Sequence, residues 1–186
     1  MRLILASGSP RRRELMEREG LDFEVRPSPA DELPPGALPW DQLCQANAER
    51  KADAVDPGSG WVIAADTLVQ VGGRVLGKPR DRDEARAMLE SLSGRDHEVR
   101  TGVCLRSAQG METFVVATRV RFHELDASVI STYFGKVDPL DKAGAYGIQE
   151  HGEMLVERIE GDFDNVMGLP MTELMKRLKA CGAVRS

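Results

Sequence analysis

The first residues that could do chemistry are hydroxyl and guanidinium side chains that follow a short apolar segment. Residues 3–6 are Leu-Ile-Leu-Ala, and Ser7, Ser9, Arg11 and Arg12 come directly after them. The pattern predicts a buried strand, a tight turn and a helix that begins after Ser9 as its N-cap. Because a helix N-terminus presents free N–H groups to anions, and the two serines add hydroxyl donors, we expect a phosphate-binding cradle here.

The charge of this helix start supports an anion site. Arg11, Arg12 and Arg13 occupy the first turn. The positive end of the helix dipole disfavours each cation by about 0.3–1 kcal/mol, and a bound anion would reverse that effect. The alternative is that the arginines reach into solvent or pair with Glu14 and Glu17.

A carboxylate at a predicted strand end is the second candidate. Residues 61–65 are apolar and predict a buried strand, which Asp66 and Thr67 are expected to close. Ligands of open α/β sheets gather outside the carboxyl ends of strands. A carboxylate there can hold a divalent cation, orient water or accept a proton. An aspartate that caps the turn before a hairpin is the alternative.

Two further charged residues gain meaning only together with Asp66. Glu32 lies in a loop over residues 27–39 that contains five prolines, and a long ordered loop is often functional. Lys51 belongs to a predicted helix over residues 41–55. Taken singly, each side chain is best explained as a solvated surface group.

A partial phosphate-loop motif is rejected. Gly72 and Lys78 match the first part of a Walker A sequence, but Pro79 stands where the magnesium-binding hydroxyl is needed. A P-loop NTPase is therefore disfavoured. Lys78 stays a candidate because the residues around it place a cation at the end of a predicted strand.

Gln149 is a candidate for reading a nucleotide base. Its amide carries both a donor and an acceptor, which can complement the adjacent carbonyl and N–H of thymine or uracil. A loop glutamine that bonds only to backbone is the alternative.

The elements that must position these residues predict an α/β fold with a mixed sheet. Residues 72–73, a glycine pair between apolar runs, predict a hairpin turn. Asp81 is expected to cap a helix with apolar residues at i, i+3, i+4 and i+7. The other expected helices are 10–19, 41–55, 126–134 and one around 171–178; the expected strands are 3–6, 23–25, 61–65, 68–71, 74–76, 96–107, 112–122 and 155–159.

Composition excludes several classes of protein. The chain has 186 residues, of which 41% are hydrophobic and 30% charged, as is typical of a globular protein, and we expect one domain over residues 1–186. A formal net charge of −5 argues against duplex nucleic acid as the main partner. Three widely spaced cysteines predict neither a disulfide frame nor a zinc site, and fit a cytoplasmic protein. We expect no membrane segment.

Several motifs, taken in order, resemble the Maf family of nucleoside triphosphate pyrophosphatases. Each motif is weak alone, but their order and joint presence from residue 3 to residue 170 are specific. The motifs are residues 5–12 (LASGSPRR), 65–67 (ADT), 77–79 (GKP), 138–149 (DPLDKAGAYGIQ), 161–163 (GDF) and 166–170 (VMGLP).

The resemblance implies a fold and a reaction. The fold would be an elongated, twisted mixed β-sheet flanked by helices, with two lobes and a central cleft, as in inosine triphosphatase. The reaction would be hydrolysis of a nucleoside triphosphate to the monophosphate and pyrophosphate with Mg²⁺ or Mn²⁺. A homodimer would suit the family.

The resemblance also assigns roles by position. Asp66 looks like the catalytic acceptor, Asp66 and Glu32 look like the metal ligands, and Arg12, Lys51 and Lys78 complete the charged set. A second set looks like the residues that choose the base in family members preferring dTTP and UTP: Arg11, Thr67 and Gln149.

An alternative of another class stays open. Some family members are linked to control of cell division and septum formation, so the chain could be a nucleotide-binding regulator without catalysis. The intact set of Asp66, Lys51 and Lys78 argues against this, because nucleotide binding alone does not need a proton-accepting side chain held beside a metal ion.

Overall fold

Seven strands form one mixed sheet in a computed structural model, which describes residues 2–184. The strand order is β2-β1-β3-β5-β6-β7, and β4 pairs with β3. Pairing of β1 with β2 and with β3 is parallel, whereas β3–β4 and β6–β7 are antiparallel. The strands are β1 (Leu3–Leu5), β2 (Phe23–Val25), β3 (Trp61–Val71), β4 (Arg74–Leu76), β5 (Asp96–Ser107), β6 (Gly110–Phe122) and β7 (Val156–Glu160).

Along the chain, helices alternate with these strands, as the sequence predicts for an α/β fold. They are α1 (Pro10–Arg18), α2 (Trp40–Asp53), α3 (Arg82–Leu92), α4 (Ala127–Phe134), α5 (Phe163–Met167) and α6 (Met171–Ala180), with two short 3₁₀ turns, η1 (Ala143–Ala145) and η2 (Gly152–Met154). The chain divides into two compact units. The first contains residues 2–66, 101–116 and 168–184, and the second contains residues 67–100 and 117–167.

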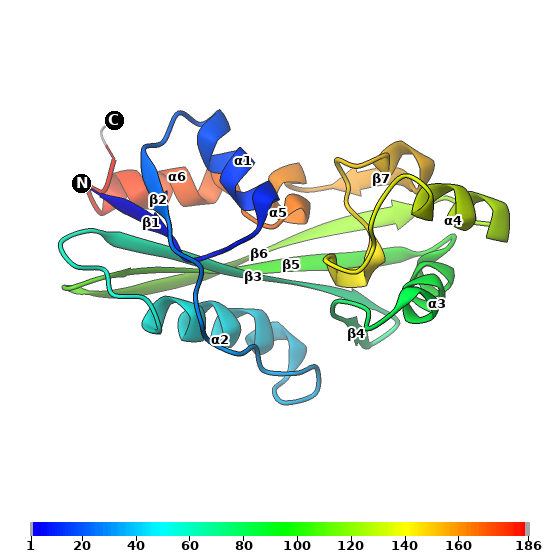
Figure 1. The fold of residues 1–186 in the computed structure, drawn as a ribbon, viewed down its shortest axis with the longest axis horizontal. Helices are drawn as coiled ribbons and strands as arrows, with labels where there is room; N and C mark the ends of the chain where they lie inside the picture. The colour runs from blue at the N-terminus through cyan, green and yellow to red at the C-terminus, as the bar shows by residue number, and fades with distance from the viewer. Residues whose placement is uncertain (1, 185–186) are drawn as a thin grey trace. The chain divides into compact units, whose positions relative to one another are not determined.

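In the first unit, α2 lies very close to the sheet. Cys44, Ala48 and Ala52 recur every four residues along one face of α2, and all three are fully buried. A Cβ atom at Gly102 of β5 would lie 2.6 Å from the backbone of Cys44, so only glycine permits this approach. Figure 1 shows α2 on one side of β1 and β3, and α1 and α6 on the other side. The close packing sets the height of the α2 side chains above the sheet.

Local signals predicted several boundaries correctly. The side chain of Asp81 accepts a hydrogen bond from the Glu84 amide and caps α3, and Asp126 caps α4 in the same way. Gly72 and Gly73 form the β3–β4 turn with φ of 55° and 81°. Both values lie in the left-handed region that a tight hairpin of this kind requires. The glycine that matches the start of the Walker A motif therefore belongs to a hairpin turn and not to a phosphate-binding loop.

The predicted end of the strand before Asp66 is wrong. β3 runs without a break from Trp61 to Val71, so Asp66 lies in its middle and not beyond its carboxyl end. The strand continues because its first part pairs with β1 and its last part, Val69–Val71, forms the hairpin with β4. The helix α5 was also missed, since its five residues are too short for a periodic signal.

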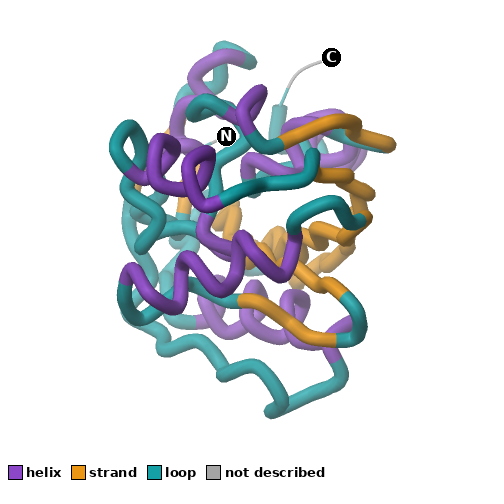
Figure 2. The backbone as a smooth tube through the Cα atoms, turned by 90° about the vertical axis from the view of Figure 1, so that its right-hand side faces the viewer, coloured by secondary structure: helices purple, strands orange, loops and turns teal. Residues whose placement is uncertain are grey.

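A long loop joins β2 to α2 over residues 26–39, where the proline-rich segment was predicted. It contains no helix or strand and is drawn in teal as the extended segment at the bottom of Figure 2. Five prolines remove backbone N–H donors from this loop. Its position therefore depends on side chains of neighbouring elements.

In the second unit, a buried histidine packs among aromatic rings. His97 is 3% exposed, its Nε2 lies 2.8 Å from the hydroxyl of Tyr146, and its ring meets Phe122 edge to face at 4.7 Å. Burial lowers the pKa of His97 to about 4, although the Arg95 backbone and Asp96 act in the opposite direction. The folded protein therefore holds this imidazole neutral.

We expect this histidine to destabilise the protein in mild acid. The unfolded chain takes up the proton near pH 6.5 and the folded chain only near pH 4, so the stability present above pH 6.5 falls as the pH drops through this window. The full loss is about 3 kcal/mol, at about 1.4 kcal/mol for each pKa unit. Urea unfolding between pH 7 and pH 4 should show a shallower pH dependence in His97→Gln. The exposed control His123→Gln should keep the wild-type slope; equal slopes in both variants would contradict the assignment.

No helix within residues 2–184 is long and apolar enough to cross a membrane.

Candidate functional site

The centre of the candidate site is a lysine between two carboxylates in the first unit. The ammonium of Lys51 lies 2.6 Å from Glu32 Oε1 and 2.8 Å from Asp66 Oδ1. The lysine side chain is 12% exposed, that of Asp66 6% and that of Glu32 44%. The sequence predicted all three as functional residues from separate elements, and the fold brings them into direct contact.

Each of the three reaches this point for a local reason. Val62, Ala64 and Asp66 alternate along β3 and share the face that α2 covers. Lys51 lies in the last turn of α2, and Glu32 comes from the loop of residues 26–39. A strand, a helix and a loop thus each supply one charged group.

Arg12 joins this group from the start of α1. Its Nε donates to the carbonyl of Gly168 at 2.8 Å and its Nη1 donates to Ser7 Oγ at 3.1 Å. These two bonds hold the half-buried guanidinium in one orientation. Ser7 Oγ also accepts from the Ser9 amide at 3.2 Å, so the turn of residues 7–9 is closed by the serine that sequence analysis placed in the cradle.

The electrostatics of Arg12 connect it to both carboxylates. Burial lowers the pKa of Arg12 below that of a free arginine, Asp66 and Glu32 raise it, and Arg11 lowers it further. The guanidinium therefore lies within electrostatic reach of the two acids. Two guanidinium groups this close together are a favourable site for an anion.

The other residues predicted for the phosphate-binding cradle differ in their contacts. Ser9 occupies the N-cap position of α1, but its side chain makes no capping hydrogen bond. Arg13 pairs with Glu17 at 3.4 Å, which is the alternative that the sequence left open for these arginines. Arg11 is half-buried beside Arg12. The functional interpretation of the arginine run therefore rests on Arg11 and Arg12.

Sequence analysis missed one residue of the first unit. Asn47 is 1% exposed and donates from Nδ2 to Asp66 Oδ2 at 3.0 Å. It lies one helical turn before Lys51, so the two side chains share a face of α2. The i, i+4 spacing to a candidate lysine was the available signal, but an isolated asparagine in a helix carries no chemical signature.

The two carboxylates fit a divalent cation that a substrate would help to hold. Glu32 and Asp66 bind the same ammonium, so their oxygens lie no farther apart than two hydrogen-bond lengths. Within residues 2–184, no group of three or more His, Cys, Asp or Glu residues could form a complete metal cage. Mg²⁺ is commonly bound by one or two carboxylates together with substrate phosphates, and this donor set matches that habit.

Three predicted residues belong to the second unit. Lys78 is exposed in the segment after β4, and the carbonyl of Gly77 before it accepts from the Gly144 amide at 3.0 Å. Thr67 is half-buried and, by strand alternation, faces away from the side of β3 that carries Asp66. Gln149 donates from Nε2 to Glu150 Oε1 at 3.3 Å, while its Oε1 is buried and accepts no hydrogen bond from residues 2–184.

A buried lysine, also missed by sequence analysis, organises the segment before Gln149. Lys142 binds the Asp138 carbonyl at 2.8 Å, Asp141 Oδ1 at 2.6 Å and Glu150 Oε1 at 3.3 Å. A Cβ atom at Gly147 would lie 2.8 Å from Lys142 Cε, so any larger residue there would push the lysine side chain aside. The glycine-rich motif is therefore folded around one ammonium group.

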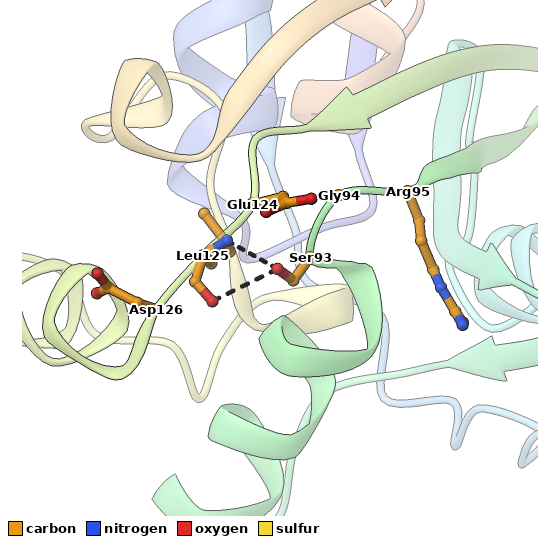
Figure 3. A pocket seen from close by; sticks show the side chains of 6 residues that line it. All are labelled: Ser93, Gly94, Arg95, Glu124, Leu125 and Asp126. Carbon is orange, nitrogen blue, oxygen red and sulfur yellow. Dashed lines mark hydrogen bonds between the residues drawn. The ribbon is translucent and has the colours of Figure 1, made fainter.

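A polar pocket of about 540 Å³ also lies in the second unit, and it contains none of the predicted site residues. Ser93 Oγ accepts from the Leu125 amide at 2.7 Å and donates to the Leu125 carbonyl at 3.4 Å (Figure 3). The pair joins the end of α3 to the segment before α4. The lining residues are Ser93, Gly94, Arg95, Glu124, Leu125 and Asp126. We interpret this pocket as a structural junction.

Comparison with known proteins places the chain among relatives of nearly equal length. A dTTP/UTP pyrophosphatase of Akkermansia muciniphila is 48% identical over 182 residues and covers 97% of this chain and 96% of its own length. A dTTP/UTP pyrophosphatase of Anaeromyxobacter dehalogenans is 52% identical over 186 residues, with 97% and 94% covered.

A solved structure shares the fold at low sequence identity. The Ham1 protein of Staphylococcus aureus superimposes with a TM-score of 0.55 and 14% identity, and the match covers 97% of this chain and 99% of that one. The family model described as Maf-like protein matches residues 2–181. With this match and relatives near 50% identity over nearly the whole chain, the protein belongs to the Maf family.

Proposed function

We propose that this protein hydrolyses nucleoside triphosphates, with dTTP and UTP preferred, to the nucleoside monophosphate and pyrophosphate. The observation that carries the proposal is the contact of Lys51 with both Glu32 and Asp66, with Arg12 in electrostatic reach of both acids. The names of the relatives support the choice of substrate. The proposed substrates also include modified pyrimidine nucleoside triphosphates.

Cations of the site would bind and neutralise the triphosphate. Arg11, Arg12, Lys51 and Lys78 would supply this charge, which would account for basic residues at the site of a protein with a net charge of −5. Ser7 and Ser9 would add donors at the start of α1. Positive groups fixed before the reaction stabilise charge on the transferring phosphoryl group and on the leaving pyrophosphate.

Asp66 would act on the attacking water. A bound Mg²⁺ or Mn²⁺, which Asp66 and Glu32 would hold, supplies charge neutralisation and makes water easier to deprotonate. Asp66 would orient a water molecule and take its proton as the water oxygen bonds to the α-phosphorus. The bond from the α-phosphorus to the bridging oxygen breaks, and pyrophosphate leaves.

Gln149 and Thr67, with Arg11, would choose the base. The Gln149 amide has a buried acceptor that no residue in the described range 2–184 satisfies, and the N–H of uracil or thymine is a donor of the kind it lacks. A donor from the same amide can face the adjacent base carbonyl. Cytosine presents the opposite pattern, with an acceptor where uracil has a donor.

The deciding experiment is product identification. Purified protein is incubated with a panel of nucleoside triphosphates and Mg²⁺ or Mn²⁺, and the products are separated. We expect monophosphate and pyrophosphate, released fastest from dTTP and UTP. Release of inorganic phosphate would contradict the reaction. Nucleotide binding without turnover would instead favour the regulator of cell division that the sequence left open.

The same panel tests the base reader. In Gln149→Glu, the new carboxylate cannot donate to the base carbonyl and repels it, so kcat/KM for dTTP and UTP should fall by about 10- to 100-fold relative to other nucleotides. Gln109→Glu, an exposed change of the same type in the β5–β6 turn, should keep the wild-type ranking. An unchanged ranking in Gln149→Glu would remove this residue as the base reader.

The remaining parts of the proposal concern the whole protein. We propose that residues 1–186 act as one Maf-like domain, that the protein works in the cytoplasm and that it forms a homodimer. Size measurement in solution tests the last point.

A further inference from the structure

Asn47 makes contact with two different parts of the candidate site through one side chain. Its Oδ1 accepts from the Leu33 amide at 2.7 Å, and its Nδ2 donates to the Leu33 carbonyl at 3.4 Å and to Asp66 Oδ2 at 3.0 Å. Asn47 is 1% exposed. A buried amide with its donor and acceptor satisfied has one orientation, because a flipped amide would face donor to donor and acceptor to acceptor.

We propose that Asn47 is a positioning residue that sets the geometry between Asp66 and Glu32. It holds the carboxylate of Asp66 directly, and it holds Glu32 through the backbone of the next residue, Leu33. The inference rests on the proposed function, because it assigns to Asn47 the alignment of two groups that the proposed reaction uses.

The loop needs such an anchor because its own backbone offers few donors. Pro34 and Pro35 follow Leu33 directly, so the Leu33 amide is the last backbone donor before two residues that have none. A two-point bond to Leu33 fixes both the position and the direction of the chain there. Without it, the segment that carries Glu32 would be held only through the side chains of Arg50 and Lys51 among these α2 residues.

Helix α2 holds three consecutive loop residues with three residues of one face. Asn47 binds Leu33, Arg50 Nε donates to the Asp31 carbonyl at 3.3 Å, and Lys51 binds Glu32. The α2 residues are at i, i+3 and i+4, which lie together on a helix surface. One face of α2 thus holds each of the three consecutive residues 31–33.

The two oxygens of Asp66 are shared between two residues of this face. Lys51 binds Oδ1 at 2.8 Å and Asn47 binds Oδ2 at 3.0 Å. Lysine is a point charge on a long flexible stem and fixes no plane, whereas the short asparagine amide does. Of the two, Asn47 is therefore the residue that can set the rotation of the carboxylate.

Two substitutions separate these contacts. Asn47→Leu keeps the approximate size and removes every hydrogen bond. Asn47→Asp keeps an acceptor for the Leu33 amide but has no donor for Asp66. The readouts are kcat and KM for dTTP, and hydrogen exchange at the Leu33 amide, which reports the loop anchor without any substrate.

We expect the two variants to differ in the rate of hydrogen exchange at the Leu33 amide but to show the same changes in kcat and KM. In Asn47→Leu the Leu33 amide should exchange at least about 10-fold faster, whereas in Asn47→Asp it should stay close to wild type. In both, kcat should fall by about 100-fold while KM changes by less than about threefold, since small misplacements of catalytic groups act on the chemical step.

Gln45 provides the matched control on the same helix. Its amide donates to Glu49 and Thr113, away from the loop and from Asp66. Gln45→Leu and Gln45→Glu should leave kcat and Leu33 exchange at wild-type values. A purely structural role of Asn47 would lower the folded fraction and speed exchange throughout α2, with kcat per folded molecule unchanged.

The outcomes separate this inference from the proposed function. If the wild type releases no pyrophosphate, the proposed function fails, and Leu33 exchange still reports the anchor. If the wild type turns over and both Asn47 variants keep kcat within about threefold, the inference alone is overturned. Should Asn47→Leu not fold, Asn47→Asp decides by itself, and a near-wild-type kcat would overturn the proposal.

Discussion

Asp66→Asn is expected to lower kcat for dTTP by about 1000-fold, within the range of general acid–base catalysis, and to leave the fold intact. Asparagine has the same shape, but it cannot take a proton from water and is a weak ligand for Mg²⁺. The fold should persist because Lys51 keeps its contact with Glu32 at 2.6 Å. Steady-state release of pyrophosphate, with circular dichroism as the check on folding, measures both parts.

A matched loss of negative charge gives the control for Asp66→Asn. Asp53 lies in the same unit, is 61% exposed and pairs with Arg106 at 3.2 Å. Asp53→Asn removes one carboxylate without touching the site, so kcat should not change. Near-normal turnover in Asp66→Asn would exclude this residue as the proton acceptor, and Glu32 would be tested next.

Much of the fold follows from local sequence signals. Capping aspartates and a glycine pair mark the starts of α3 and α4 and the β3–β4 turn, because each answers a requirement of the backbone at that position. The prediction fails at Asp66, where a charged residue after five apolar ones suggests an end. The partners that continue β3 are distant in sequence, and no local pattern reveals them.

In the candidate site too, some residues are marked by a local sequence signal and others depend on partners distant in sequence. Arg12 and Asp66 carry charge in an unusual local context, which is visible in a sequence, whereas Lys51 was assigned only through the resemblance to the Maf family. Asn47 and Lys142 act through hydrogen bonds to backbone and to other side chains. Such roles exist only once the chain is folded, so residue type alone does not predict them.

Histidine and arginine illustrate what burial adds. His97 in sequence is an isolated titratable residue, and only its burial beside Phe122 and Tyr146 lowers its pKa to about 4, so that it stays neutral in mild acid. Arg12 and Arg13 are adjacent and identical, yet one binds the Gly168 carbonyl and the other pairs with Glu17 along the helix. Helix geometry separates neighbouring side chains by about 100°, so equal residues meet different surroundings.

Lys51→Met is the second variant with a large expected effect. It keeps the length of the side chain and removes the ammonium between Glu32 and Asp66. Breaking a buried ion pair costs about 3–5 kcal/mol, and because Glu32 is 44% exposed we expect about 1–3 kcal/mol here. Turnover should also fall, by about 100-fold in kcat/KM, since a cation that neutralises phosphate charge is lost.

The effect of divalent cations on stability tests, without any assay of turnover, whether Lys51 and a metal ion compete for Glu32 and Asp66. Two facing carboxylates without their ammonium form a stronger site for Mg²⁺ or Mn²⁺, and a ligand that binds only the folded state raises its stability. The thermal midpoint of Lys51→Met should therefore rise more with added Mn²⁺ than that of the wild type. Lys176→Met, a change at a lysine 77% exposed, should respond as the wild type does.

The direction of that shift tests the proposed metal ligands. A larger cation response in Lys51→Met means that the ammonium and the metal compete for Glu32 and Asp66, and that Lys51 must move from these oxygens when a metal binds. An equal response in all three proteins would place the cation elsewhere, and Asp66 would then act on water without a metal beside it.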